Sequence, residues 1–262
     1  RCAFRRTITP MAGRLEIERL SVRLGQQLIL DEVSFSVLPA RILAAVGASG
    51  SGKTTLLRAL AGLLPPGASA SGRIAFEGRE LSLQPGAANQ RTWRGLRGRR
   101  LACIPQEPQA ALDPRRSVRA HLRECGGGPE LLAEVGLDPT RASDYPFQWS
   151  GGMQQRLLIA LALSRRPAVL LGDEPSAALD SWHQSQILRL LRALCQARQL
   201  AAFIATHDLA FAAALADEVL VLADGRVVEA GPPRQIFSCP AHPATARLVA
   251  AQLPWSYADG RA

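Results

Sequence analysis

The residues best suited to chemistry form a glycine-rich run that ends in a lysine and a threonine. From Gly47 to Thr54 the sequence reads GASGSGKT, which satisfies the pattern GxxxxGK[ST] of phosphate-binding loops. Glycines let backbone N–H groups approach phosphate oxygens, and a helix that begins at the phosphates adds its own unpaired N–H groups. Lys53 can reach the β- and γ-phosphates of a nucleotide, and the Thr54 hydroxyl can bind Mg²⁺. The residues predicted to hold the nucleotide here are Gly47, Ala48, Ser49, Gly50, Ser51, Gly52, Lys53, Thr54 and Thr55.

An acidic pair after an apolar run is the second candidate group. Val169–Leu171 is typical of a buried strand, and Asp173 and Glu174 follow it closely. Asp173 can enter the coordination shell of Mg²⁺, and Glu174 can orient or deprotonate an attacking water. Such a pair is often no more than two exposed polar residues, but beside a phosphate loop it predicts nucleotide hydrolysis.

A serine followed by two glycines, Ser150, Gly151 and Gly152, stands at the start of a predicted helix. A serine hydroxyl and exposed N–H groups at a helix start can bind an anion. One nucleotide does not need two such sites in one chain, so the duplication makes sense if the second site covers the nucleotide of a partner chain. An ordinary serine N-cap after a glycine-containing turn is the alternative.

The elements that must position these groups alternate between strands and helices. Apolar runs predict strands at Leu15–Leu20, Val33–Val37, Ile42–Val46, Arg73–Phe76, Leu101–Ile104, Val169–Leu171, Ala202–Ala205 and Val219–Leu222. Helices are predicted at Thr54–Ala61, Met153–Ser164, Trp182–Arg198 and Asp208–Leu215. A mostly helical stretch is predicted at Arg115–Thr140 with a break at Gly126–Gly128, and a helix-breaking segment at Leu63–Gly72. This alternation predicts an α/β fold with a mostly parallel sheet, and it places the glycine-rich run between a strand and a helix.

Composition limits the class of protein further. Hydrophobic residues make up 47% and charged residues 20%, which is typical of a globular domain. The longest apolar run is Leu209–Ala216, far short of the ~20 residues that a membrane-spanning helix needs. The five cysteines form no CxxC pair, which argues against a zinc site or a disulfide framework and fits a reducing cytosol. The net charge of +9, with a dense patch at Arg91–Arg100, leaves open a solvated surface, a membrane-proximal surface or nucleic-acid binding.

Six short motifs together resemble the ATPase subunits of ABC transporters, in the order that this family shows. They are the phosphate loop, Gln106 within Ile104–Pro108, the Ser150–Gln154 signature, Asp173–Glu174, Ser176–Asp180, and His207 within Ala205–Asp208. The resemblance implies that Glu174, His207 and Gln106 act in catalysis and that Thr54, Gln106 and Asp173 hold Mg²⁺. It also implies that His207 contacts the γ-phosphate, that Gln106 links the nucleotide to the membrane subunits, and that Asp180 lies between the two halves of a dimer.

The same resemblance implies the fold, cofactors and partners. The expected fold is that of a P-loop NTPase with an N-terminal antiparallel β part and a helical subdomain inserted at about residues 107–165. The domain is expected at 13–253, with 1–12 a disordered or upstream segment and 254–262 a tail. The cofactors are ATP and Mg²⁺. The expected partners are a second ATPase subunit (identical or a paralogue) in a nucleotide sandwich, two membrane permeases and, indirectly, a solute-binding protein. Nucleic acid is not expected. The implied location is peripheral, at the cytoplasmic face of the inner membrane.

Two departures from the family pattern bear on the finer assignment. The stretch Ser21–Gly25 lacks the aromatic residue that usually stacks on adenine, so adenine is expected to pack on aliphatic side chains. The signature reads SGGM, which is similar to the nickel and peptide importers, and within that branch Tyr145–Leu163 is most similar to the first ATPase subunit of nickel importers. A nickel or metal-chelate importer is therefore expected. A peptide importer, a soluble non-transport ABC ATPase and a P-loop kinase are the alternatives.

Overall fold

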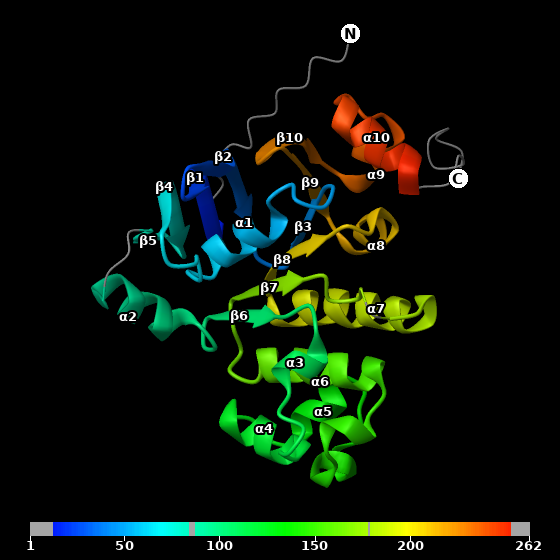
Figure 1. The fold of residues 1–262 in the computed structure, drawn as a ribbon. Coiled ribbons are helices and arrows are strands. Elements are labelled where there is room, and N and C mark those ends of the chain that lie inside the picture. The colour runs from blue at the N-terminus through cyan, green and yellow to red at the C-terminus, as the bar shows by residue number, and fades with distance from the viewer. Residues whose placement is uncertain (1–12, 84–86, 178, 253–262) are drawn as a thin grey trace.

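The computed structural model describes residues 13–83, 87–177 and 179–252, and its centre is a six-stranded sheet (Figure 1). The strands are β3 (Ile42–Val46), β6 (Leu101–Ile104), β7 (Val169–Asp173), β8 (Ala201–Thr206), β9 (Glu218–Ala223) and β10 (Arg226–Gly231), in the order β10-β9-β3-β8-β7-β6. All neighbours are parallel except β10, which pairs antiparallel with β9. Every residue of β3 and β8 is buried, which explains their continuous apolar sequence, because both faces of a parallel sheet are covered.

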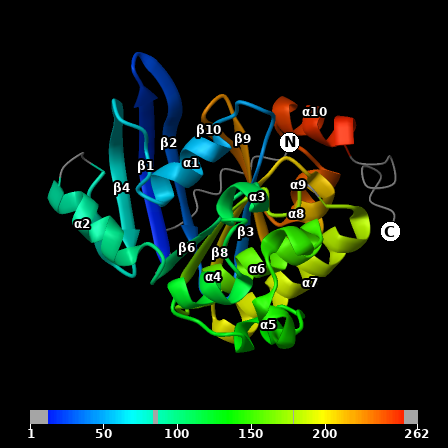
Figure 2. The same cartoon turned by 60° about the horizontal axis from the view of Figure 1, so that its bottom comes forward.

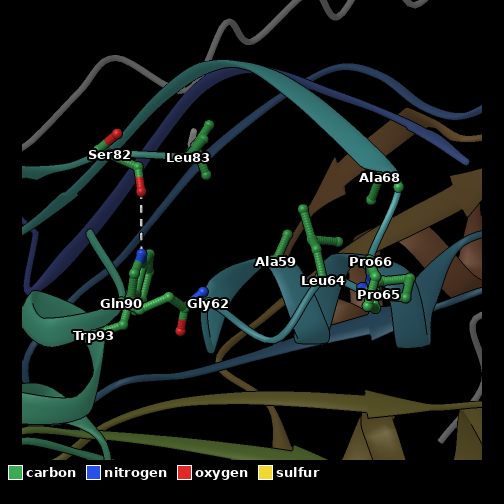
Figure 3. Close-up of a pocket in the computed structure, with 11 residues that line it drawn as sticks. Ala59, Gly62, Leu64, Pro65, Pro66, Ala68, Ser82, Leu83, Gln90 and Trp93 are labelled. Atoms are coloured by element: carbon green, nitrogen blue, oxygen red, sulfur yellow. Dashed lines mark hydrogen bonds between the residues drawn. The ribbon is translucent and has the colours of Figure 1, made fainter. Parts of the chain in front are cut away.

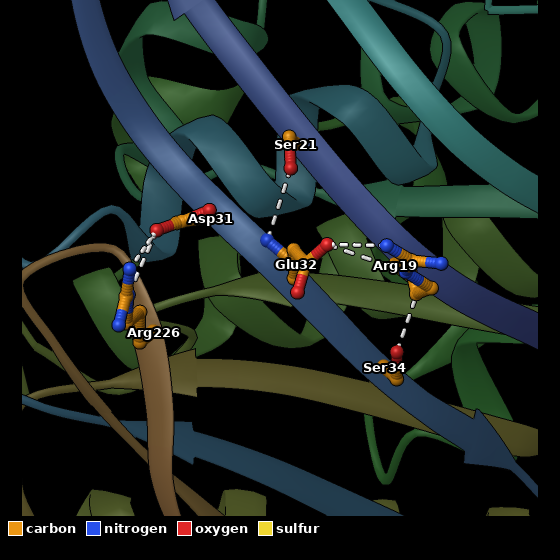
Figure 4. Close-up of polar contacts among 6 residues, drawn as sticks. All are labelled: Arg19, Ser21, Asp31, Glu32, Ser34 and Arg226. Atoms are coloured by element: carbon orange, nitrogen blue, oxygen red, sulfur yellow. Dashed lines mark hydrogen bonds and ion pairs between the residues drawn. The ribbon is translucent and has the colours of Figure 1, made fainter.

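A separate antiparallel sheet lies beside it, with the order β2-β1-β4-β5. Its strands are β1 (Leu15–Leu24), β2 (Gln27–Val37), β4 (Ala68–Phe76) and β5 (Arg79–Leu81). β1 and β2 carry facing irregularities at Arg19 and Glu32, where the backbone is left-handed and the two side chains form an ion pair of 2.7 Å (Figure 4). The hydroxyls of Ser21 and Ser34 accept the backbone N–H groups of Glu32 and Arg19 at this point (Figure 4). These side-chain bonds satisfy donors that the interrupted ladder leaves unpaired.

Contacts made by β2 join the two sheets. The ring of Phe35 on β2 stacks on Phe203 of β8, with centroids 5.2 Å apart. Arg226 at the start of β10 donates through Nε to the Asp31 carboxylate at 2.8 Å (Figure 4). The Asp31 N–H donates to the Gly225 carbonyl. Side chains from both sheets therefore share one hydrophobic core.

Helices surround the sheets in separate groups. They are α1 (Lys53–Leu60), α2 (Ala87–Leu96), α3 (Pro108–Ala111), α4 (Val118–Glu124), α5 (Glu130–Glu134), α6 (Gly151–Leu163), α7 (Ser181–Arg198), α8 (Leu209–Leu215), α9 (Pro233–Ser238) and α10 (Pro243–Gln252), with 3-10 turns η1 (Pro139–Ser143) and η2 (Pro146–Gln148). The helices α3 to α6 fall between β6 and β7 in the chain and gather on the far side of these strands from α1 (Figure 1). The helix α2 stands beside the antiparallel sheet, away from α9 and α10 (Figure 2). None of the described helices is long and apolar enough to cross a membrane.

The structure confirms the α/β fold with its mostly parallel sheet and N-terminal antiparallel part, and it corrects one local prediction. The stretch Arg115–Thr140 contains α4, α5 and the start of η1, with the predicted break at Gly126–Gly128, where Gly126 takes a left-handed φ of 81°. The segment Leu63–Gly72 breaks the helix as predicted, but its second half already belongs to β4. The segments expected at 1–12 and 254–262 lie outside the described residues.

The helix α2, unforeseen in the sequence, is attached to α1 by a close approach of Trp93 to Gly62 (Figure 3). Gly62 follows α1 with φ 64°, and a Cβ there would lie 2.2 Å from Cδ2 of the buried Trp93 ring. The indole N–H donates to the Ser82 carbonyl at 3.1 Å, which fixes the ring in this position (Figure 3). Gly62 is thus required both by its backbone angle and by the space that the ring leaves.

We expect Gly62→Ala to lower the free energy of unfolding by about 2–4 kcal/mol, combining a left-handed alanine with overpacking against Trp93. Gly67→Ala is the matched control, because Gly67 has φ 80° but a Cβ there would meet no atom within 4 Å. That variant should lose only the backbone part, about 1–2 kcal/mol. Urea unfolding of both variants measures the difference, and equal losses would contradict the packing role of Trp93.

Candidate active site

Four of the predicted site groups follow the carboxyl ends of neighbouring strands. In the sheet register Val46 of β3 lies beside Thr206 of β8, Ala205 beside Asp173 of β7, and Gly172 beside Ile104 of β6. The phosphate loop, His207, Glu174 and Gln106 come directly after these strand ends, or two residues after in the case of Gln106. Parallel strands all end at one edge of the sheet, which is where open α/β sheets bind ligands. The structure therefore brings these groups to one edge.

Close packing explains the glycines of the phosphate loop. A Cβ at Gly47 would lie 2.3 Å from the Leu222 carbonyl oxygen at the end of β9, and one at Gly52 would lie 2.8 Å from Cδ2 of Leu30 on β2. Gly50 and Gly52 also have left-handed φ angles of 78° and 106°. The helix α1 begins immediately after Gly52 without a side-chain cap, so its first N–H groups face the loop without a side-chain acceptor.

Lys53 is folded into this loop rather than extended into solvent. Only 8% of the residue is exposed, and its ammonium donates to the carbonyl oxygens of Gly47 at 2.7 Å and Ala48 at 3.0 Å. Burial lowers the pKa of Lys53, while the carboxylates of Glu174 and Asp173 oppose that shift. The Ser51 hydroxyl is buried as well and has no hydrogen-bond partner among the residues that the structure describes. A loop that holds a buried ammonium and an unpaired hydroxyl donor fits a phosphate group, which accepts from both.

The acidic pair lies across this edge from the lysine. Burial and the neighbouring Glu174 raise the pKa of Asp173, while a hydrogen bond from Thr54 counteracts the shift. A hydroxyl and a carboxylate in contact are oxygen donors of the kind that Mg²⁺ prefers, so the residues present fit this ion.

Glu174 has an unusual backbone and a histidine partner. Its φ of 46° is left-handed, and its N–H donates to the Ala205 carbonyl at 2.8 Å, which holds the turn after β7 in place. One Glu174 oxygen lies 2.7 Å from Nδ1 of His207. An ionised carboxylate only accepts, so Nδ1 carries a proton and Nε2 is left for another partner. The arrangement can hold a water or a phosphate oxygen between an acceptor and a ring nitrogen.

The signature Ser150–Gly152 does not join this group within one chain. Ser150 is the N-cap of α6, and its hydroxyl accepts the Met153 N–H at 3.4 Å. It lines a hollow of about 520 Å³ together with Gly152, Trp182 and His183, and no phosphate-loop residue takes part in that hollow. Within one chain Ser150 is thus an exposed serine N-cap, which is the alternative that the sequence left open, and its role as an anion site stays a prediction.

Sequence reasoning missed His183 as part of this second group. Its ring bonds the Asp180 carboxylate and rests on Gly152, although the sequence showed only an isolated histidine. Its position three residues after an aspartate N-cap was the available signal, because residues three apart share a helix face.

The parallel sheet, the phosphate loop and the acidic strand end define a P-loop nucleoside triphosphatase. A protein-family profile described as ABC transporter matches residues 14–177. The chain belongs to the ABC transporter family, and within it is an ATP-binding and ATP-hydrolysing subunit.

Individual relatives are similar in sequence over most of the chain. This chain is 41% identical over 245 residues to the nickel import ATP-binding protein NikD of Brucella abortus biovar 1 (strain 9-941), and the match covers 87% of this chain and 90% of that protein. The dipeptide transport ATP-binding protein DppD of Escherichia coli (strain K12) is 37% identical over 257 residues, covering 90% and 77% respectively.

Solved structures give the same fold. The structure of cbiO1 from Clostridium perfringens, described as part of the ABC transporter complex cbiONQ, has a TM-score of 0.76 at 25% identity and covers 94% of this chain and 98% of that one. A dimeric post-hydrolysis state of the ATP-binding cassette MJ0796, bound to ADP and Pi, has a TM-score of 0.69 at 23% identity and covers 84% and 98%.

We expect Lys53→Ala to weaken ATP binding roughly 100-fold, because it removes a charged donor from the phosphates. Lys53→Met keeps most of the buried stem, so an equal loss in that variant assigns the effect to the ammonium. Arg119→Ala, at an exposed position on α4, should bind normally. Titration with a fluorescent ATP analogue measures all three, and normal binding by Lys53→Met would contradict the role given to the lysine.

Proposed function

We propose that this chain powers an importer of nickel or a metal chelate, as one of two ATPase subunits bound at the cytoplasmic face of the inner membrane. The observation that carries the ATPase part is the single sheet edge on which Lys53, Asp173, Glu174 and His207 meet. The similarity to nickel import proteins supports the solute class.

In this proposal the loop Gly47–Thr55 wraps the phosphates, and Lys53 moves from the loop carbonyls to the β- and γ-phosphate oxygens. Thr54, Asp173 and Gln106 hold Mg²⁺, which neutralises phosphate charge when bound. Glu174 accepts the proton of the attacking water, and His207 uses Nε2 toward the γ-phosphate while its Nδ1–H holds the carboxylate. Gln106 lies two residues after β6, just before α3, and passes the state of the nucleotide to the membrane subunits.

The second ATPase subunit is part of the proposal because the signature lies apart from its own phosphate loop. Ser150, Gly151 and Gly152 would complete the nucleotide site of the partner, whether that is a second copy or a paralogue. A dimeric arrangement in the related cassette supports this expectation. Two permeases and, through them, a solute-binding protein complete the assembly, and no nucleic acid is needed.

We expect Glu174→Gln to retain ATP but to lower turnover by about 10²–10⁴-fold, the scale of general-base catalysis. Since bound ATP then persists, it should hold the chain and its ATPase partner together, which light scattering detects. Glu218→Gln, at the exposed opposite end of β9, is the matched control and should hydrolyse normally without a trapped dimer. Full-rate hydrolysis by the unsubstituted chain as a dilute monomer would refute the sandwich arrangement.

The solute is tested in cells rather than on the chain, because specificity belongs to the binding protein and the membrane pore. Deletion of the gene should reduce uptake of labelled nickel when nickel is scarce and leave sensitivity to a toxic tripeptide unchanged. The Glu218→Gln gene should restore uptake and the Glu174→Gln gene should not. Loss of peptide sensitivity with normal nickel uptake would instead support a di- or oligopeptide importer, which the similarity to a dipeptide transport subunit makes the second candidate.

A further inference from the structure

His183 connects two motifs that are about thirty residues apart in the chain. It stands in the first turn of α7, three residues after Asp180, which ends the motif Ser176–Asp180 and caps the helix. The Asp180 carboxylate accepts the backbone N–H of His183 at 2.9 Å and its ring Nδ1 at 2.8 Å. Because an ionised carboxylate can only accept, Nδ1 carries the ring proton. One residue thus holds this carboxylate with two bonds.

The other side of the ring rests on the signature helix. A Cβ on Gly152 would lie 2.5 Å from Cδ2 and 3.2 Å from Nε2 of His183. Gly152 does not have a left-handed φ, so its lack of a side chain serves the approach of the ring rather than an unusual backbone. Trp182 packs edge-on against the same imidazole, with centroids 4.8 Å apart. The ring is therefore fixed between Asp180, Gly152 and Trp182.

Other charged groups near this hollow are engaged elsewhere. Arg156 donates to the Gly136 carbonyl at 3.3 Å, and Arg141 pairs with Asp144 at 2.7 Å. In the described part of the chain no other side chain bonds to Asp180. Two hydrogen bonds from His183 lower the pKa of Asp180: the larger effect comes from its backbone N–H and the smaller from its ring.

We infer that His183 is a positioning residue, which fixes Asp180 relative to Ser150 and Gly152 so that both motifs meet the nucleotide of the partner subunit together. This inference rests on the proposed sandwich dimer. In this inference His183 itself touches no nucleotide, because its ring lies against Gly152 of the signature. Its effect should appear when two subunits close on ATP, and not when one chain binds ATP in its own loop.

The test uses the Glu174→Gln full-length chain with its ATPase partner, and measures the ATP concentration at half-maximal dimer formation. His183→Ala should raise that concentration by about tenfold, on the scale of one lost charge-assisted hydrogen bond. His183→Asn places an amide donor near the position of Nδ1 and should recover to within about threefold. Binding of a fluorescent ATP analogue to the single chain should be the same in all variants.

Gln186→Ala is the matched control, because Gln186 lines the same hollow one turn further along α7. It should leave dimer formation unchanged. Unchanged dimer formation by His183→Ala, or an equal defect in His183→Asn and His183→Ala, would overturn the inference. If the Glu174→Gln parent itself forms no ATP-dependent dimer, the sandwich proposal fails first, so the two failures are distinguishable.

Discussion

The hydrogen-bonded register of β3, β8 and β7 is the constraint on which the nucleotide site depends. It places the end of β3 beside the end of β8, and Ala205 of β8 beside Asp173 of β7. β3 and β8 are buried along their whole length, which keeps both strand ends inside the covered sheet. The contacts among Lys53, the acidic pair and His207 are consequences of this alignment.

The burial of charge at this edge has an energetic cost that the site itself partly offsets. An ammonium and a carboxylate that are both removed from water shift their pKa values toward the neutral forms, as Lys53 and Asp173 do. The loop carbonyls around Lys53 and the Thr54 hydroxyl beside Asp173 reduce this cost. A phosphate group would replace the carbonyls with a stronger partner for the lysine, so the site is prepared for an anion.

A second rigid unit presents the signature. The Asp144 carboxylate accepts from the Trp149 indole at 3.0 Å and pairs with Arg141, whose guanidinium lies over the same indole. Gln154 donates to the carbonyls of Pro146 and Trp149, which fixes the turn before α6. The helices on this side share a hydrophobic core with the central sheet, which contributes Ile104, Leu170 and Ile204, so the signature is held firmly against the sheet.

The sequence by itself determined the phosphate loop, the acidic pair, the signature helix start and the alternating elements, because each depends on residues adjacent in the chain. Backbone angles that favour glycine and N–H groups at a helix start are local properties.

The sequence did not reveal α2, a polar helix that is attached to the fold through Trp93 and Gly62. It also did not reveal β10, α9 and α10, which are short and lie near the edge of the fold. The role of the patch Arg91–Arg100 could not be predicted from composition either. In the structure Arg97 donates to the carbonyls of Ala61 and Gly62 after α1, and Arg100 pairs with Glu77. Only the tertiary structure decided that His207 meets Glu174, that Ser150 stands apart from Lys53, and that His183 rests on Gly152. Those meetings depend on strand order and helix packing between distant segments, which no local pattern specifies.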